Sequence, residues 1–192
     1  MFDGGVFSIR NRDPTDLPAC LEILSRVYEK DGYPVQGPSL PFLQSPNTIS
    51  CWVASPTSWG DTQSNKPPGR VVGHVALSTA TESDIAVQVW RDQKRPEPVF
   101  VLERLFVDPE HRRWGVAGYL MASVVDEARE RGGKVVLFAL IKDQGAMKLY
   151  ERLGWTEFGR GIYGQGKGEG VEMEAVCFVA PEGRVSRTGS ED

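Results

Sequence analysis

The sequence contains few of the residues that hold disulfide-rich or metal-binding proteins together. Its 192 residues include three cysteines, Cys20, Cys51 and Cys177, and two histidines. The cysteines are scattered, so they form neither a metal-ligand spacing nor an even set for disulfide pairing. Structural disulfides are rare in reducing compartments, so the lack of a disulfide set leads us to expect a cytoplasmic protein. The lack of a ligand spacing leads us to expect that it binds no metal.

Long runs of one chemical character are also missing. No apolar run approaches the length of a membrane span, and the first residues, 1–6, lack the basic start and apolar core of a signal peptide. The net charge is −4, and no Lys/Arg-rich tract offsets it, which argues against a nucleic-acid partner. We therefore expect neither a membrane nor a nucleic acid as partner.

The remaining composition is typical of a globular α/β protein. Hydrophobic residues make up 40% of the chain and charged residues 25%, as in ordinary folded domains. The apolar periodicity predicts the order β-α-β-β-β-α-β-α-β-β, which indicates a mixed sheet packed by helices. We expect one domain over residues 1–180 and a disordered tail over residues 181–192.

Four long segments that connect the predicted helices and strands have little regular structure of their own. Residues 79–98 are polar except for a β-prone run, residues 85–90, which would extend a hairpin and place Trp90 on the surface or near a partner. The other three segments are rich in glycine or proline and are candidates for acceptor-side loops: residues 33–46, 55–70 and 159–170.

The most informative stretch runs from Val99 to Ala128. Residues 99–107 are rich in β-branched and aromatic side chains and predict a strand, which Asp108-Pro109 ends. After Gly115, apolar residues recur at helical spacing until Gly132-Gly133 stops the helix.

The turn between this strand and this helix offers groups that bind phosphate. Unpaired amides and the positive dipole end at a helix start attract anions. Gly115 allows a ligand close to the backbone, and Arg112 and Arg113 add planar donors. A plain turn with solvated arginines fits these residues equally well. The run Gly115-Val116-Ala117-Gly118 matches neither a Walker loop nor a dinucleotide fingerprint.

The turn resembles the acyl-CoA loop of the GNAT superfamily of N-acetyltransferases. That loop reads Gln or Arg, two residues, Gly, one residue, then Gly or Ala, and this chain has Arg112-Arg113-Trp114-Gly115-Val116-Ala117. A second family motif, Asn-x-x-Ala-x-x-Leu-Tyr-Glu-x-x-Gly-aromatic, is matched from Asp143 to Trp155, with Asp143 in place of Asn. The motifs stand in the family's order, and the resemblance covers about residues 7–180.

The resemblance implies a GNAT-like fold, a mixed sheet of six to seven strands flanked by three to four helices. It also implies acetyl-CoA as co-substrate, with its pantetheine arm along the central strand and its pyrophosphate on the turn. An added carboxylate at Asp143 would weaken the binding of this polyanion unless it faces away. The implied cofactor-binding residues are Leu105, Phe106, Val107, Arg112, Arg113, Trp114, Gly115, Val116, Ala117, Gly118, Asp143, Ala146 and Tyr150.

Two residues are candidates for proton transfer. Tyr150 matches the family tyrosine that acts as general acid toward the leaving thiolate; a core-facing tyrosine is the alternative. Glu103 is the candidate base, because strand alternation places it on the face of Leu105 and Val107. A salt-bridged glutamate, with deprotonation by water, fits equally well. His74 is expected to be a partnered residue of the sheet.

The sequence therefore predicts an acyl-CoA-dependent N-acyltransferase. The simplest version transfers acetyl to a primary amine of a small molecule by direct attack in a ternary complex. A protein lysine or N-terminal acetyltransferase and a non-catalytic acyl-CoA-binding module are the alternatives. The acceptor amine, the acyl length and the general base stay open. Dimers are frequent in the family, so a homodimer is one open arrangement.

Overall fold

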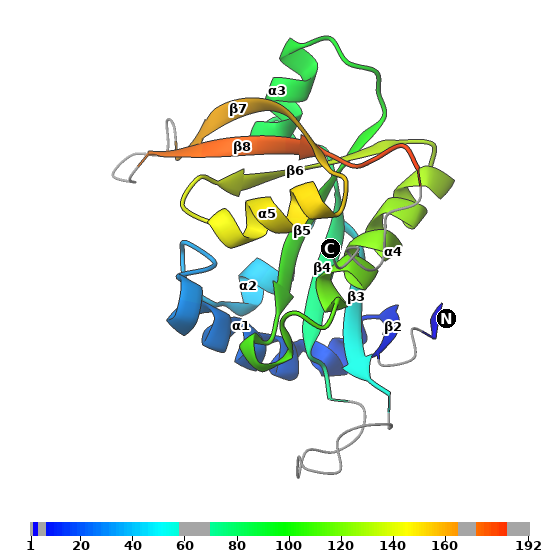
Figure 1. Cartoon of the computed structure of the whole chain (residues 1–192), viewed down its shortest axis with the longest axis vertical. Helices are drawn as coiled ribbons and strands as arrows, with labels where there is room; N and C mark the ends of the chain where they lie inside the picture. Colours follow the sequence, from blue (N-terminus) through cyan, green and yellow to red (C-terminus); the bar gives the residue numbers. More distant parts are fainter. Residues whose placement is uncertain (1, 4–6, 58–69, 165–171, 184–192) are drawn as a thin grey trace.

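A computed structural model describes residues 2–3, 7–57, 70–164 and 172–183 (Figure 1). Within these residues one sheet has the order β1-β2-β3-β4-β5-β6-β8-β7, and only β5 and β6 pair in parallel. The strands are β1 (Phe2–Asp3), β2 (Phe7–Asn11), β3 (Thr48–Pro56), β4 (Gly73–Thr79), β5 (Val99–Val107), β6 (Lys134–Leu140), β7 (Thr156–Tyr163) and β8 (Met173–Val179).

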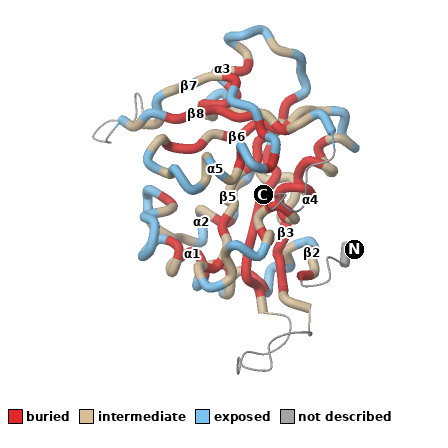
Figure 2. The backbone as a smooth tube through the Cα atoms, in the orientation of Figure 1, coloured by how far each residue is buried: buried red, intermediate tan, exposed pale blue. Residues whose placement is uncertain are grey.

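Helices cover both faces of the sheet. In the described residues they are α1 (Leu17–Asp31), α2 (Leu40–Leu43), α3 (Ile85–Asp92), α4 (Val116–Glu130) and α5 (Gln144–Arg152), with the 3-10 turns η1 (Pro14–Asp16) and η2 (Pro109–His111). The main core lies between one face and the α4/α5 pair, and two further cores lie under α1/α2 and under α3. Burial accordingly concentrates along the strands and the inner side of α4 (Figure 2). None of the described helices is long and apolar enough to cross a membrane.

The predicted mixed α/β class is confirmed, with seven longer strands and the two-residue β1 in the described part of the chain. The central strand, residues 99–107, has the predicted bounds, and the helix after Gly115 begins at Val116. The described residues form five helices instead of the three to four predicted, because α2 is a single turn and α3 replaces a predicted strand.

The predicted β-prone run, residues 85–90, is wrong: these residues belong to helix α3. Asp84 caps the helix by accepting a hydrogen bond from the Val87 amide at 3.1 Å. Trp90, expected at the surface, is only 3% exposed, and its indole N–H donates to the Pro96 carbonyl at 3.0 Å. Ile85 and Val89 are four residues apart, so both turn toward β7 in a helix.

The predicted loop at residues 159–170 is wrong in its first part. Strand β7 continues to Tyr163, and Gly159 and Gly161 pair with Cys177 and Ala175 of β8. These glycines leave space for α3, because a methyl group at Gly161 would overlap Ile85. Residues 165–171, most of the predicted loop 55–70, and residues 184–192 of the predicted tail lie outside the described residues.

Candidate active site

Strands β5 and β6 part shortly after they begin, and the site is built where they part. Their parallel pairing covers only Val99–Val101 against Lys134–Val136. Figure 1 shows the two strands running in clearly different directions beyond that point, with α5 beside the opening. Parallel strands normally continue an evenly spaced ladder, so this divergence leaves one backbone edge of β5 without a strand partner in the described residues.

A β-bulge in β5 lies at this opening. Glu103 pairs with Ala76 of β4 and Phe106 pairs with His74, so the two residues 104–105 stand opposite one residue. Arg104 has a φ of +55°, a left-handed conformation that a non-glycine residue adopts at a cost. Such a bulge bends the strand and changes the direction of the side chains that follow.

The bulge overturns the predicted placement of Glu103. Alternation predicts Glu103 on the face of Leu105 and Val107, but the extra residue puts it on the opposite face. Val101 belongs to the core under α3, and Glu103 follows on its face, paired with Ala76. Leu105 and Val107 pack instead into the core under α4. Glu103 therefore faces the side of the sheet that carries α1, α2 and α3.

Two donors hold the Glu103 carboxylate on that face. Its Oε2 accepts a hydrogen bond from the Ser78 hydroxyl at 2.6 Å and is ion-paired with Arg104. The Arg104 guanidinium also donates to the Phe42 carbonyl and lies 5.4 Å from the Phe42 ring centroid. These contacts connect the bulge to α2.

Tyr150 belongs to α5, the helix beside the opening, and only 8% of its surface is exposed. Its ring packs against Trp155 and Phe178, with centroid distances of 6.2 and 5.6 Å. Burial raises the pKa of Tyr150, and the charge of Asp143 raises it further. The hydroxyl therefore keeps its proton at neutral pH and can donate it.

Tyr33, which the sequence patterns do not single out, packs beside α2. Burial raises the pKa of Tyr33. Its ring meets Phe42 edge to face at 5.9 Å. The only signal for Tyr33 was its position in the Gly/Pro-rich segment 33–46, predicted as an acceptor-side loop.

The predicted phosphate turn lies on the other side of the opening. Gly115 has a φ of +78° and precedes α4, whose first amides have no side-chain cap. Arg113 is exposed and pairs with none of the described carboxylates, whereas Arg112 is ion-paired with Asp31 at the end of α1. Trp114 is 62% exposed. Arg113 is therefore the more available of the two arginines for an anion.

The other predicted cofactor residues differ in what they expose. Val116 and Gly118 are buried against the core, so only their backbones can face a ligand. Ala117 and Ala146 are half-buried. The Asp143 carboxylate accepts a hydrogen bond from Lys142 at 2.8 Å, which offsets the negative charge at the position where the family motif has Asn.

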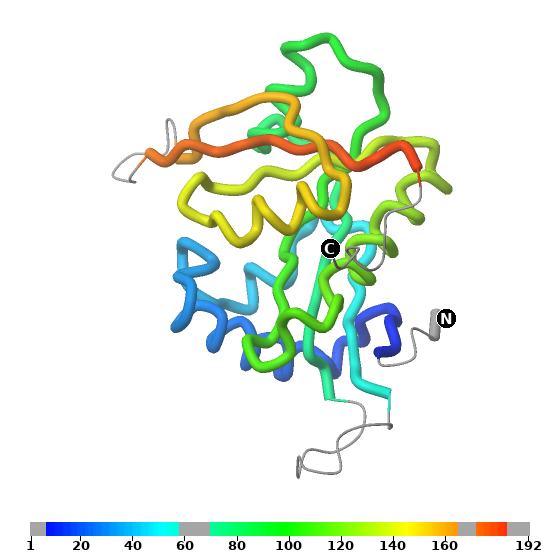
Figure 3. The backbone as a smooth tube through the Cα atoms, in the orientation of Figure 1, coloured from blue at the N-terminus to red at the C-terminus, as the bar shows by residue number. Residues whose placement is uncertain are grey.

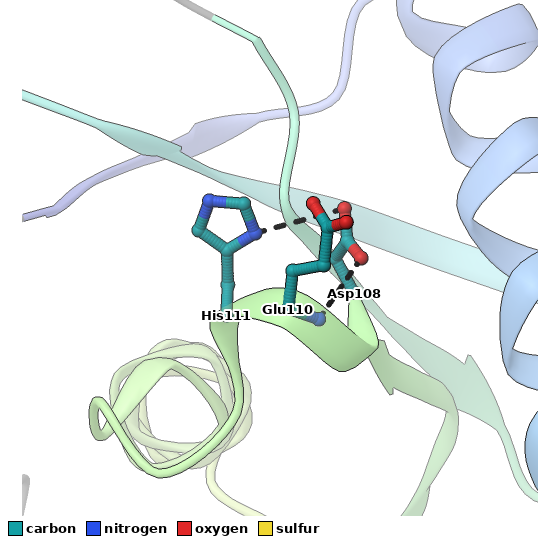
Figure 4. A group of neighbouring side chains, drawn as sticks. All are labelled: Asp108, Glu110 and His111. Carbon is teal, nitrogen blue, oxygen red and sulfur yellow. Dashed lines mark hydrogen bonds and ion pairs between the residues drawn. The ribbon is translucent and has the colours of Figure 1, made fainter. Parts of the chain in front are cut away.

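A buried aspartate fixes the path from β5 into the phosphate turn (Figure 4). Asp108 is fully buried; it accepts hydrogen bonds from the Glu110 amide at 3.3 Å and from Arg26 of α1 at 2.8 Å, and His111 lies 3.6 Å away. Burial tends to raise the pKa of Asp108, but these donors outweigh it and hold the pKa below the usual value. Figure 3 shows α1 beside this green turn.

Comparison with known proteins identifies the family. The sequence model of the acetyltransferase (GNAT) family matches residues 18–155, more than half of the chain, so the chain belongs to the GNAT family. An uncharacterized N-acetyltransferase of Methanocaldococcus jannaschii, MJ1207, is 32% identical over 90 residues, which are 46% of this chain and 36% of that protein. The match thus spans about a third of that relative.

Solved structures show the same fold. Arabidopsis thaliana NAA60, in complex with acetyl-CoA, superposes with a TM-score of 0.63 at 22% identity, over 90% of this chain and 98% of that one. The ribosomal-protein-S18-alanine N-acetyltransferase of Escherichia coli gives a TM-score of 0.55 at 17% identity, over 97% and 98%. The predicted GNAT-like fold is confirmed.

Proposed function

We propose that this chain is a cytoplasmic enzyme that transfers an acetyl group from acetyl-CoA to a primary amine of a small molecule. The main support for this proposal is the divergence of β5 and β6, because it leaves a backbone edge between a helix start without a side-chain cap and a buried tyrosine. Membership in the GNAT family and the acetyl-CoA complex of NAA60 support it.

The residues present fit coenzyme A. The free amides at the start of α4 and the exposed Arg113 suit a pyrophosphate. The unpaired edge of β5 suits the amide groups of a pantetheine arm, which add to it as a short strand would. Trp114 offers an exposed aromatic surface beside the turn.

Catalysis requires stabilisation of an oxyanion and transfer of two protons. The amine nitrogen attacks the thioester carbonyl carbon, and backbone amides of β5 near Leu105–Val107 donate to the oxygen that becomes negative. As the carbon–sulfur bond breaks, Tyr150 donates its proton to the leaving thiolate. The ammonium proton of the acceptor goes to Glu103 or to water before the attack. The second proton, which the nitrogen loses as the amide forms, returns to Tyr150 and regenerates the phenol.

The acceptor side holds two carboxylates and the Arg104 guanidinium. Glu103 faces α2 and α3, and its charge helps burial to raise the pKa of Asp84 to about 6. Arg104 offsets the charge of Glu103, so Asp84 is the carboxylate of this pair that favours a cationic acceptor. A protein α-amine is the second candidate, since the E. coli structural neighbour is an alanine N-acetyltransferase for ribosomal protein S18.

The proposal is tested by release of free thiol from acetyl-CoA in the presence of an amine panel that includes polyamines, amino acids and peptides. Turnover with a small amine supports the proposal, and turnover only with peptides or proteins favours the second candidate. Calorimetry on the same preparation measures cofactor binding separately. Binding without turnover on any acceptor would instead indicate a non-catalytic acyl-CoA-binding module.

A further inference from the structure

His74 lies directly beside the bulge of β5 and is completely buried. It sits on β4 opposite Phe106, and the two rings stack with centroids 5.1 Å apart and planes 17° from parallel. Its Nδ1 is 3.0 Å from the carbonyl oxygen of Arg104, the residue with the left-handed backbone. Its Nε2 is 3.0 Å from Nη1 of Arg12.

These two partners decide where the imidazole proton lies. An arginine can only donate, so the nitrogen that meets Arg12 must be the acceptor. The proton therefore lies on Nδ1, from which His74 donates to the Arg104 carbonyl, itself an obligatory acceptor. A neutral Nδ1–H tautomer satisfies both contacts, and a second proton would face the guanidinium of Arg12.

The same network holds α2. Arg12 donates to the Leu43 carbonyl at 2.9 Å, and Arg104 donates to the Phe42 carbonyl. Both carbonyls lie at the end of α2, where a helix has no internal donors left. His74 thus stands between two arginines that bond to α2, Arg12 directly after β2 and Arg104 on β5, and it is the direct partner of the carbonyl inside the bulge.

For a residue other than glycine, the left-handed backbone conformation costs about 1 kcal/mol or more in free energy. The surrounding contacts must therefore hold Arg104 in it. We propose that His74 is a positioning residue that holds the bulge through its bond to the Arg104 carbonyl. In this arrangement the next amides of β5 point at the acyl oxygen and Glu103 points at the acceptor. The proposal rests on the proposed function for its catalytic consequence, although the bond itself does not.

Two variants separate this role from general stability. In His74→Asn the side-chain amide nitrogen takes the place of Nδ1 and can still donate to Arg104, but the contact with Arg12 is lost. In His74→Gln the side-chain oxygen reaches the place of Nε2 and keeps Arg12, but the bond to Arg104 is lost. Both replacements are uncharged and leave a cavity beside Phe106, so each serves as the control for the other.

We expect kcat of His74→Asn to stay within about threefold of the parent, and that of His74→Gln to fall about tenfold or more, because the amides that stabilise the oxyanion move. In His74→Gln, KM for acetyl-CoA should change by a smaller factor than kcat, since the pyrophosphate contacts of the phosphate turn are separate from the bulge. Equal losses of kcat in both variants, or no loss in His74→Gln, would overturn the proposal.

A second measurement does not need the reaction. Imidazole nitrogen resonances of the 15N-labelled parent should show a protonated Nδ1 and an unprotonated Nε2, and amide hydrogen exchange at residues 104–106 should be faster in His74→Gln than in His74→Asn. A protonated Nε2, or equal exchange in the variants, would overturn the proposal. If the parent binds no acetyl-CoA, the proposed function fails, and these two readings still decide the role of His74.

Discussion

From the burial of His74 we also predict how the free energy of unfolding changes with pH. Burial lowers the pKa of His74 to about 4; the bond to Arg104 opposes this shift, Arg12 and Arg104 reinforce it, and Asp16 weakly opposes it. The unfolded chain binds this proton below pH ~6.5 and the folded chain does not, so the free energy of unfolding falls as the pH drops toward 4. The gap between the two pKa values corresponds to about 3 kcal/mol.

Asp84 acts in the opposite direction over nearly the same range. Its pKa is raised to about 6 by burial and by the charge of Glu103. Between pH ~6 and ~4 the folded chain holds this proton and the unfolded chain has released it, so acidification stabilises the fold. The size is similar, about 2 to 3 kcal/mol. In the parent protein the contributions of His74 and Asp84 to the pH dependence of the unfolding free energy largely cancel. A variant that lacks one of the two groups shows the contribution of the other.

The assay is urea unfolding of three proteins at pH ~7 and pH ~4, with the change between the two pH values compared. His74→Asn should lose about 3 kcal/mol less than the parent on acidification, since the titrating group is gone. Asp84→Asn, which preserves the helix cap, should lose about 2 to 3 kcal/mol more. If His74→Asn responds to pH as the parent does, His74 is not held neutral and the reasoning about its tautomer is refuted.

Three further predictions concern the opening, the turn and α3. Tyr150→Phe should lower kcat by about a hundredfold or more in the thiol-release assay, while calorimetry shows unchanged acetyl-CoA affinity; unchanged turnover would exclude Tyr150 as the acid. Arg113→Ala should weaken acetyl-CoA binding about tenfold, through loss of a charge-assisted contact, and equal affinity in parent and variant would place the pyrophosphate elsewhere. Gly161→Ala should destabilise the chain by about 1 to 3 kcal/mol, because its methyl overlaps Ile85. The control Gly145→Ala meets nothing within 4 Å and should slightly stabilise α5; a similar melting temperature for both variants would contradict the packing of α3 on β7.

The central part of the fold could be predicted because each signal in it is local. Residues 99–107 favour a strand by composition, Pro109 ends it, and Gly115 takes the left-handed conformation that starts α4. Two motifs then indicated the family. The partnered state expected of His74 is confirmed by its bonds to Arg12 and Arg104.

The missed features depend on contacts between distant segments. Residues 85–90 have apolar side chains at spacings that fit either a strand or a helix. The glycines of β7, about seventy residues later in the chain, leave the space that helix α3 occupies. The bulge at Arg104 carries no glycine, and its register is set by β4 and by His74. Alternation alone therefore placed Glu103 on the wrong face, although its position near the opening was predicted.

The central claim is that coenzyme A binds where β5 and β6 part, with its pyrophosphate on the amides that begin α4. Amide hydrogen exchange of the full chain with and without acetyl-CoA tests it most directly. The account predicts slower exchange at residues 104–107 and 113–118. Protection instead around the hollow formed by Val125, Arg129 and Lys134, with none at those residues, would contradict it.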